Sequence, residues 1–224
     1  MKQALKVWWG SLGQVLTVYR EDVRQKWYNI NMITGLLFPN NATKEERQID
    51  WRLIAEISDS DFGFNNLKSK DNRTRFNVRC ILRNNNGDIC VIKSEEYGYA
   101  QIPGGGINDK ETIMDALRRE IQEETGFLIM GIEPIGYILE KREDAQNNHD
   151  WNKAISYVFS AFSEEEIGTN YTEDENADGF RPIWISLDDF IAEKEKLMDK
   201  ANSYSGHFSD KRDLEIAKFF KNSI

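Results

Sequence analysis

The chain has 224 residues, a formal net charge of −9, and 40% hydrophobic and 30% charged residues. This balance favours a folded core over global disorder, and the acidic charge disfavours general binding to DNA or RNA backbones. No apolar stretch is long enough for a membrane span, and Met1 to Tyr19 lacks the features of a signal peptide. The sequence therefore predicts neither a nucleic-acid nor a membrane partner, and leaves a homodimer open.

Residues 1–31 differ from the acidic remainder because they combine basic residues with three tryptophans. We interpret residues 1–70 as an N-terminal extension that is helical in part and ends in a linker, and residues 71–224 as the main domain. The first 31 residues have two interpretations. They form either a contact for a partner or membrane surface, or an added helix packed on the domain (or an upstream stretch before a second start at Met32).

The two cysteines, Cys80 and Cys90, flank a segment whose Asn-Gly pair at positions 86–87 favours a tight hairpin. A turn centred on that pair places each thiol opposite a basic residue of the other strand rather than opposite the second thiol. The sequence therefore predicts reduced cysteines and a cytoplasmic protein, with a redox pair as the alternative.

From residue 75 the chain alternates between strand and helix signals. The predicted strands cover residues 76–82, 89–93, 100–102, one or two within 127–139, 154–162 and 180–185. The predicted helices cover residues 108–125, 187–200 and 210–222, the last with Ser209 as its N-cap. Strands on both sides of a central helix, followed by terminal helices, predict an α/β sandwich with a mixed central sheet.

The central helix carries the clearest chemical signal. Asn108 is predicted to cap it, with Glu111 three residues later as in a capping box, and Gly126 is predicted to end it. At 3.6 residues per turn, the apolar stripe includes Leu117 and Ile121. The opposite face is predicted to carry four polar residues, Asp115, Arg118, Arg119 and Gln122.

Glu120, Glu123 and Glu124 lie on or beside the apolar stripe of this helix. A solvated acidic face is the structural alternative, but such a face should lie away from the core. Grouped carboxylates that are partly buried need a compensating cation. Oxygen ligands without nearby Cys or His favour Mg²⁺, with Mn²⁺ as a substitute.

The segment from Gly105 to Phe127 resembles the Nudix signature over 23 residues. That signature is Gly, five residues, Glu, seven residues, Arg-Glu, an apolar residue, any residue, Glu-Glu, any residue, Gly and an apolar residue. The matching positions here are Gly105, Glu111, Arg119, Glu120, Ile121, Glu123, Glu124, Gly126 and Phe127. Ala100 departs from the family, since many members carry an aromatic residue there. Tyr99 or Tyr97 can fill that space, so base stacking at this position is not predicted.

The resemblance implies a Nudix-type α/β/α sandwich and a pyrophosphohydrolase acting on a small nucleotide. It implies that Glu120, Glu123, Glu124 and the carbonyl of Gly104 hold Mg²⁺. It also implies that Arg119 orients the carboxylates and that Glu111 anchors the glycine loop at Gly104 and Gly105. The metal would activate a water molecule that attacks phosphorus.

The general base is predicted in the acidic segment after residue 162. We choose Glu175, because many resembling proteins carry a loop glutamate before a final strand that contains a tryptophan, here Trp184. A solvated loop carboxylate is the alternative for this residue. Other candidates are Glu164–Glu166, Glu173 and Asp174, with His149 as a weaker one.

The sequence leaves the substrate open. It can be a nucleoside triphosphate, an ADP-ribose-like compound, a nucleotide sugar or a dinucleoside polyphosphate. A nucleotide-sensing domain without turnover is the alternative function, although a complete carboxylate set argues against it.

Overall fold

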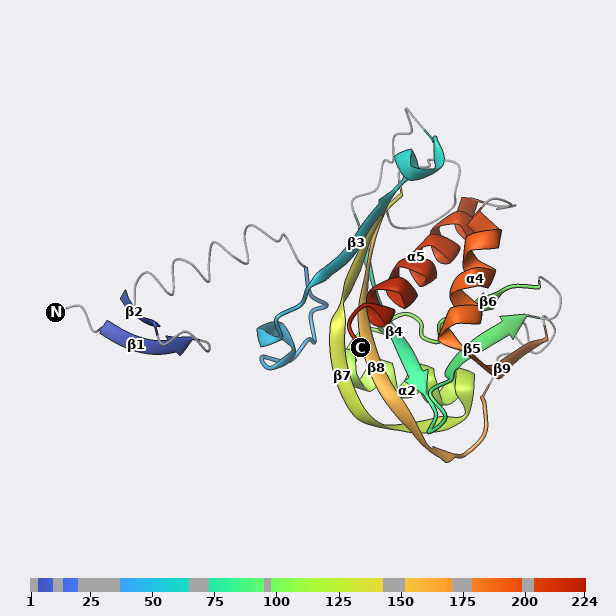
Figure 1. Ribbon diagram of the computed structural model, residues 1–224, viewed down its shortest axis with the longest axis horizontal. Helices are drawn as coiled ribbons and strands as arrows, with labels where there is room; N and C mark the ends of the chain where they lie inside the picture. Colours follow the sequence, from blue (N-terminus) through green and yellow to red (C-terminus); the bar gives the residue numbers. More distant parts are fainter. Residues whose placement is uncertain are drawn as a thin grey trace. The chain divides into compact units, whose positions relative to one another are not determined.

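The computed structural model describes residues 4–9, 14–19, 37–64, 73–94, 98–142, 152–170, 179–198 and 204–224 (Figure 1). The chain divides into two compact units, residues 1–38 and 39–224. In the first unit, strands β1 (Ala4–Trp9) and β2 (Gln14–Tyr19) pair antiparallel. The partly helical character predicted for the extension is not seen at these twelve residues, and residues 20–36 lie outside the described ranges.

The second unit is built on a mixed sheet that has seven strands among the described residues. Its path runs β3-β7-β8-β4-β5-β6, and β9 pairs with β5. The strands are β3 (Leu53–Ser58), β4 (Thr74–Arg83), β5 (Ile89–Ser94), β6 (Ala100–Gln101), β7 (Phe127–Lys141), β8 (Lys153–Glu166) and β9 (Phe180–Ile185). Pairs β3–β7 and β4–β8 are parallel and the others antiparallel, which confirms the predicted mixed α/β fold.

The sheet is buried on both faces, as the alternation along β4 shows. Ile81 packs into a core shared with Phe208 and Phe220 of the C-terminal helix, whereas its neighbours Cys80 and Leu82 point to the other face and are equally buried. Helices α4 (Leu187–Met198) and α5 (Tyr204–Lys221) lie side by side over the first face (Figure 1). Helix α2 (Ile113–Thr125) covers the second face with its own buried apolar stripe.

The predicted domain boundary at residue 70 lies too far along the chain. Strand β3 pairs with β7, and the 3₁₀ helix η1 (Glu46–Gln48) precedes it within the same compact unit. The buried Glu46 carboxylate accepts hydrogen bonds from the backbone N–H groups of Met114 (2.9 Å) and Thr43 (2.7 Å). Residues 39–64 therefore belong to the domain. Glu46 caps α2 from outside the helix by accepting a hydrogen bond from the N–H group of Met114 in its first turn.

The thiols are buried and free, as the sequence predicted. The hairpin register differs, because Cys90 pairs with Leu82 rather than facing Arg83. Burial raises the pKa of both thiols, that of Cys90 to about 12. They are therefore protonated parts of the core and are not poised for redox chemistry.

Candidate active site

The glycine loop before α2 is attached to β4 by backbone hydrogen bonds. Val78 N–H donates to the Gly105 carbonyl (2.9 Å), and Cys80 N–H donates to the Pro103 carbonyl (3.0 Å). Gly104 has φ of 133°, and a Cβ there would lie 2.2 Å from the Val78 carbonyl oxygen. Only glycine fits at this position, so the loop is seated against the strand by its lack of a side chain.

Helix α2 begins later than the sequence predicted. Lys110 has φ of 75°, a left-handed conformation that a helix cannot continue through. Thr112 is the N-cap, and its side-chain oxygen accepts a hydrogen bond from Asp115 N–H (3.1 Å). Asn108 is therefore not the cap, although its N–H does donate to Glu111 Oε2 (2.9 Å) and closes a turn before the helix. Gly126 ends the helix as predicted, with φ of 77°.

Arg119 is the organising side chain of the site. Its Nε and Nη2 bind the two oxygens of Glu111 at 2.6 and 2.9 Å. Its Nη1 donates to both Glu120 Oε1 (2.8 Å) and Glu123 Oε2 (3.0 Å), and Nη2 also donates to the Gly106 carbonyl (2.9 Å). The guanidinium thus fixes three carboxylates and the glycine loop together, and it does not lie on the opposite face of the helix as predicted.

The third glutamate of the predicted ligand set contacts the loop directly. Glu124 Oε2 accepts a hydrogen bond from Gly104 N–H (2.7 Å). The Gly104 carbonyl accepts from Nη1 of Arg79, a residue of β4 that the sequence did not single out. Burial, with Arg212 nearby, lowers the pKa of Arg79 to about 10, which leaves it protonated at neutral pH. A partly buried cation therefore lies beside the carbonyl that was predicted to bind metal.

The donor set suits a hard divalent cation. Glu120 and Glu123 direct one oxygen each at the same cationic nitrogen of Arg119, and the Glu120 side chain is only 13% exposed. Burial raises the pKa of Glu120 despite the opposing hydrogen bond from Arg119. Across the described ranges, no three His, Cys, Asp or Glu side chains already converge as a metal site. The carboxylates fit Mg²⁺ by their chemistry, and binding it requires them to share their oxygens between Arg119 and the ion.

The structure separates the general-base candidates. Glu164, Glu165 and Glu166 are exposed residues of β8, so they are not loop residues as predicted. Glu173, Asp174, Glu175 and His149 lie outside the described residues, and so does Tyr97. Trp184 lies in β9, the strand in which it was predicted, and its ring centroid is 5.5 Å from that of Phe127.

A sandwiched mixed sheet, a glycine loop on β4 and a carboxylate-bearing α2 define a Nudix-type hydrolase domain. A family model described as the NUDIX domain matches residues 73–205, and the chain belongs to this family. It is accordingly an enzyme of the pyrophosphohydrolase class.

Curated relatives are similar over parts of the chain. An RNA pyrophosphohydrolase of Hahella chejuensis (strain KCTC 2396) is 29% identical over 140 residues, which cover 57% of this chain and 87% of the relative. An RNA pyrophosphohydrolase of Stenotrophomonas maltophilia (strain K279a) is 37% identical over 62 residues, 28% of this chain and 30% of that protein. A solved Nudix hydrolase from Nitrosomonas europaea matches with a TM-score of 0.49 and 15% identity, covering 67% of this chain and 90% of that one. No described helix is long and apolar enough to cross a membrane.

Proposed function

We propose that this chain hydrolyses a diphosphate linkage in a nucleoside diphosphate derivative with Mg²⁺ as cofactor. The observation that carries the proposal is the charge imbalance at α2. Arg119 pairs with Glu111, Glu120 and Glu123, and Arg79 is a second cation close to Glu120 and Glu124. Among the described residues of the site, the four carboxylates therefore outnumber these two guanidinium groups. An additional cation would relieve this repulsion, and Mg²⁺ held by these carboxylates would supply one and would activate a water molecule.

The chain's own residues position the substrate and the ligands. Arg119 holds Glu120 and Glu123 in place while Glu111 fixes the guanidinium from the other side. Glu124 ties the loop to the helix through Gly104 N–H. Glu120, Glu123, Glu124 and the Gly104 carbonyl would hold the metal, and we propose Glu175 as the base that accepts the proton of the attacking water.

A 5′-triphosphorylated RNA end is the second candidate substrate. The similarity to RNA pyrophosphohydrolases favours it, because one of these relatives is matched over most of its length. The net charge of −9 favours a free nucleotide instead, since a longer RNA adds backbone phosphates that an acidic surface repels. The two buried free thiols support a cytoplasmic location for either reaction.

A substrate panel with product identification tests the function. GTP, ADP-ribose, a nucleotide sugar and a 5′-triphosphorylated RNA oligonucleotide are incubated with and without Mg²⁺, and the products are identified by mass. We expect a nucleoside monophosphate, or a 5′-monophosphorylated RNA, that forms only with the metal. Equal turnover in EDTA would contradict the metal role, and tight binding without any product would establish the nucleotide-sensing alternative.

A further inference from the structure

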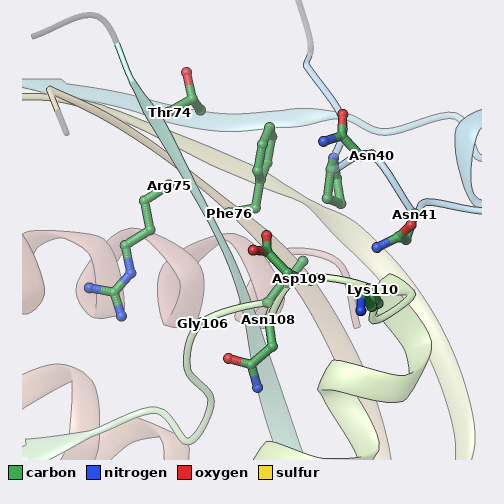
Figure 2. Close-up of a pocket in the computed structure, with 11 residues that line it drawn as sticks. Asn40, Asn41, Thr74, Arg75, Phe76, Gly106, Asn108, Asp109 and Lys110 are labelled. Atoms are coloured by element: carbon green, nitrogen blue, oxygen red, sulfur yellow. The ribbon is translucent and has the colours of Figure 1, made fainter. Parts of the chain in front are cut away.

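A cavity of about 730 Å³ opens beside the glycine loop, between the start of β4, the turn before α2 and residues 39–41 (Figure 2). Its volume lies within the range of small-molecule sites, roughly 300–1,000 Å³. The side chains that give it chemical character are Asn40, Asn41, Arg75, Phe76, Asn108, Asp109 and Lys110. Of these residues, only Asn108 has a predicted role, as a helix cap.

The wall formed by residues 39–41 is held rigidly. Arg47 donates from Nε to the Ala42 carbonyl (3.1 Å) and from Nη2 to the Pro39 carbonyl (3.0 Å). Glu46, one residue earlier, binds the first turn of α2 through Met114 N–H. The two asparagines therefore lie in a loop whose backbone carbonyls on either side are hydrogen-bonded to Arg47.

The lining separates into two chemical halves. Figure 2 shows the Phe76 ring and Asn40 on one side of β4, with Arg75 extending from the other side toward Gly106. The Arg75 guanidinium lies over this glycine, since a Cβ there would be 3.4 Å from Arg75 Nη2. One half offers an aromatic face and carboxamides, which suit a nucleobase, and the other half offers a cation, which suits phosphate.

The cavity shares a wall with the carboxylate cluster. The Gly106 carbonyl accepts a hydrogen bond from Arg119 Nη2 at 2.9 Å, so the glycine that Arg75 covers is bound to the residue that holds the carboxylates. The preceding Gly105 lies against Glu120, because a Cβ on Gly105 would be 2.4 Å from Glu120 Oε2. Adjacent Cα atoms are about 3.8 Å apart, so a ligand in the cavity can extend its phosphates over the loop to the carboxylates.

We propose that this cavity receives the nucleoside whose phosphates are cleaved. Phe76 stacks on the base, Asn40 and Asn41 contact the base edge, and Arg75 binds the phosphate nearest the nucleoside. The proposal rests on the proposed function and deepens it. The same chemistry serves a free nucleotide and the first nucleoside of an RNA. Residues 39–41 lie outside the segment matched by the family model, so this chain would select its base partly with residues of its own.

The test compares substrates with and without a base. For Phe76→Ala, KM for GTP and for the triphosphorylated RNA should rise about 5- to 150-fold, as expected for losing a base–aromatic stack. The inhibition constant of inorganic tripolyphosphate, which has no base, should stay unchanged. Arg75→Gln should weaken all three ligands. If Phe76→Ala raises KM for GTP alone, the cavity binds free nucleotides. If it raises KM for the RNA alone, the cavity binds RNA ends.

Phe162→Ala is the matched control, because that ring is 37% exposed on β8 and does not line the cavity. If Phe76→Ala fails to fold, the exposed pair Asn40→Ala and Asn41→Ala takes its place and should also raise KM. A KM within twofold of wild type for the folded cavity variants, with turnover intact, would overturn the proposal.

The failure of the proposed function would look different. If no panel substrate is cleaved, the hydrolase assignment fails, and calorimetry with GTP and Mg²⁺ then tests the cavity alone. Weaker GTP binding in Phe76→Ala than in wild type would still support the cavity. Absent or unaltered GTP binding would overturn it.

Discussion

Two clusters of charged side chains lie on opposite faces of the sheet, and their balance differs. On the α5 face, three buried ion pairs join Lys194 to Asp210 (2.6 Å), Arg212 to Asp213 (2.9 Å) and Arg142 to Glu140 (2.8 Å). On the α2 face, the single guanidinium of Arg119 pairs with three partly exposed carboxylates, those of Glu111, Glu120 and Glu123. The three ion pairs of the first cluster balance in charge and are buried, whereas the second cluster is negative and partly accessible.

The difference separates structural from functional charge. A buried cluster must compensate itself, because each unpaired ion would cost several kcal/mol. An accessible cluster can keep an excess of one sign if it recruits a partner from solution. The two clusters are linked by a hydrogen bond. Asp213 Oδ2, in the first cluster, accepts it from the N–H of Ile102 (3.0 Å), just before the glycine loop. The neutral cluster thus supports the loop on which the negative one depends.

The largest effect should come from neutralising the α2 cluster. Glu120→Gln and Glu124→Gln each remove a proposed metal ligand, and turnover should fall by about 10²- to 10⁴-fold, the loss of several kcal/mol of transition-state stabilisation. The fold should survive, because a glutamine amide fills the same space. Near-normal rates in either purified variant would refute the site. Glu164→Gln, an exposed change on β8, is the control.

Breaking the neutral cluster should destabilise the protein. Lys194 is fully buried on α4, so Lys194→Met leaves Asp210 without its close cation and should cost about 3–5 kcal/mol in the free energy of unfolding. Urea denaturation measures the loss. The exposed pair Lys141–Glu56, at 2.6 Å, is the control, and Lys141→Met should cost less than about 1 kcal/mol. Equal costs for the two variants would contradict the contrast between buried and exposed charge.

A smaller loss should follow from removing the cap that residue 46 provides for α2. Glu46→Ala leaves two backbone N–H groups, of Met114 and Thr43, without their acceptor. The expected cost is about 1–3 kcal/mol in the free energy of unfolding, measured by denaturant titration. Glu45→Ala, at the neighbouring exposed position, should be nearly neutral. A stable Glu46 variant would show that residues 39–52 do not support the active-site helix.

The sequence could predict what local spacing encodes, which includes most strands, the end of α2 at Gly126 and the grouping of its glutamates. It could not predict partners that are distant along the chain. Met114 and Glu46 are 68 residues apart, and Ile102 and Asp213 are 111 apart. One local signal was missed, because Thr43 and Glu46 form a capping-box pair, with Glu46 N–H donating to Thr43 Oγ1 (3.1 Å). Helix α5 also begins at Tyr204 rather than at residue 210, so Ser209 is an interior residue and not its N-cap.

The smallest effect concerns acid stability at the edge of the α2 cluster. The hydrogen bond from Arg119 holds the pKa of Glu111 below its ordinary value, so the folded state binds this proton less readily than the unfolded chain. The resulting stabilisation is present above the ordinary glutamate pKa of about 4.3 and is lost as the pH falls through the lower folded value. Glu111→Gln should therefore be less stable than wild type at neutral pH, and this gap should close on acidification. Unfolding free energies measured for both proteins from pH 7 to pH 3 give the comparison. A gap that stays constant across that range would mean that Glu111 acts through its shape and hydrogen bonds rather than through its charge.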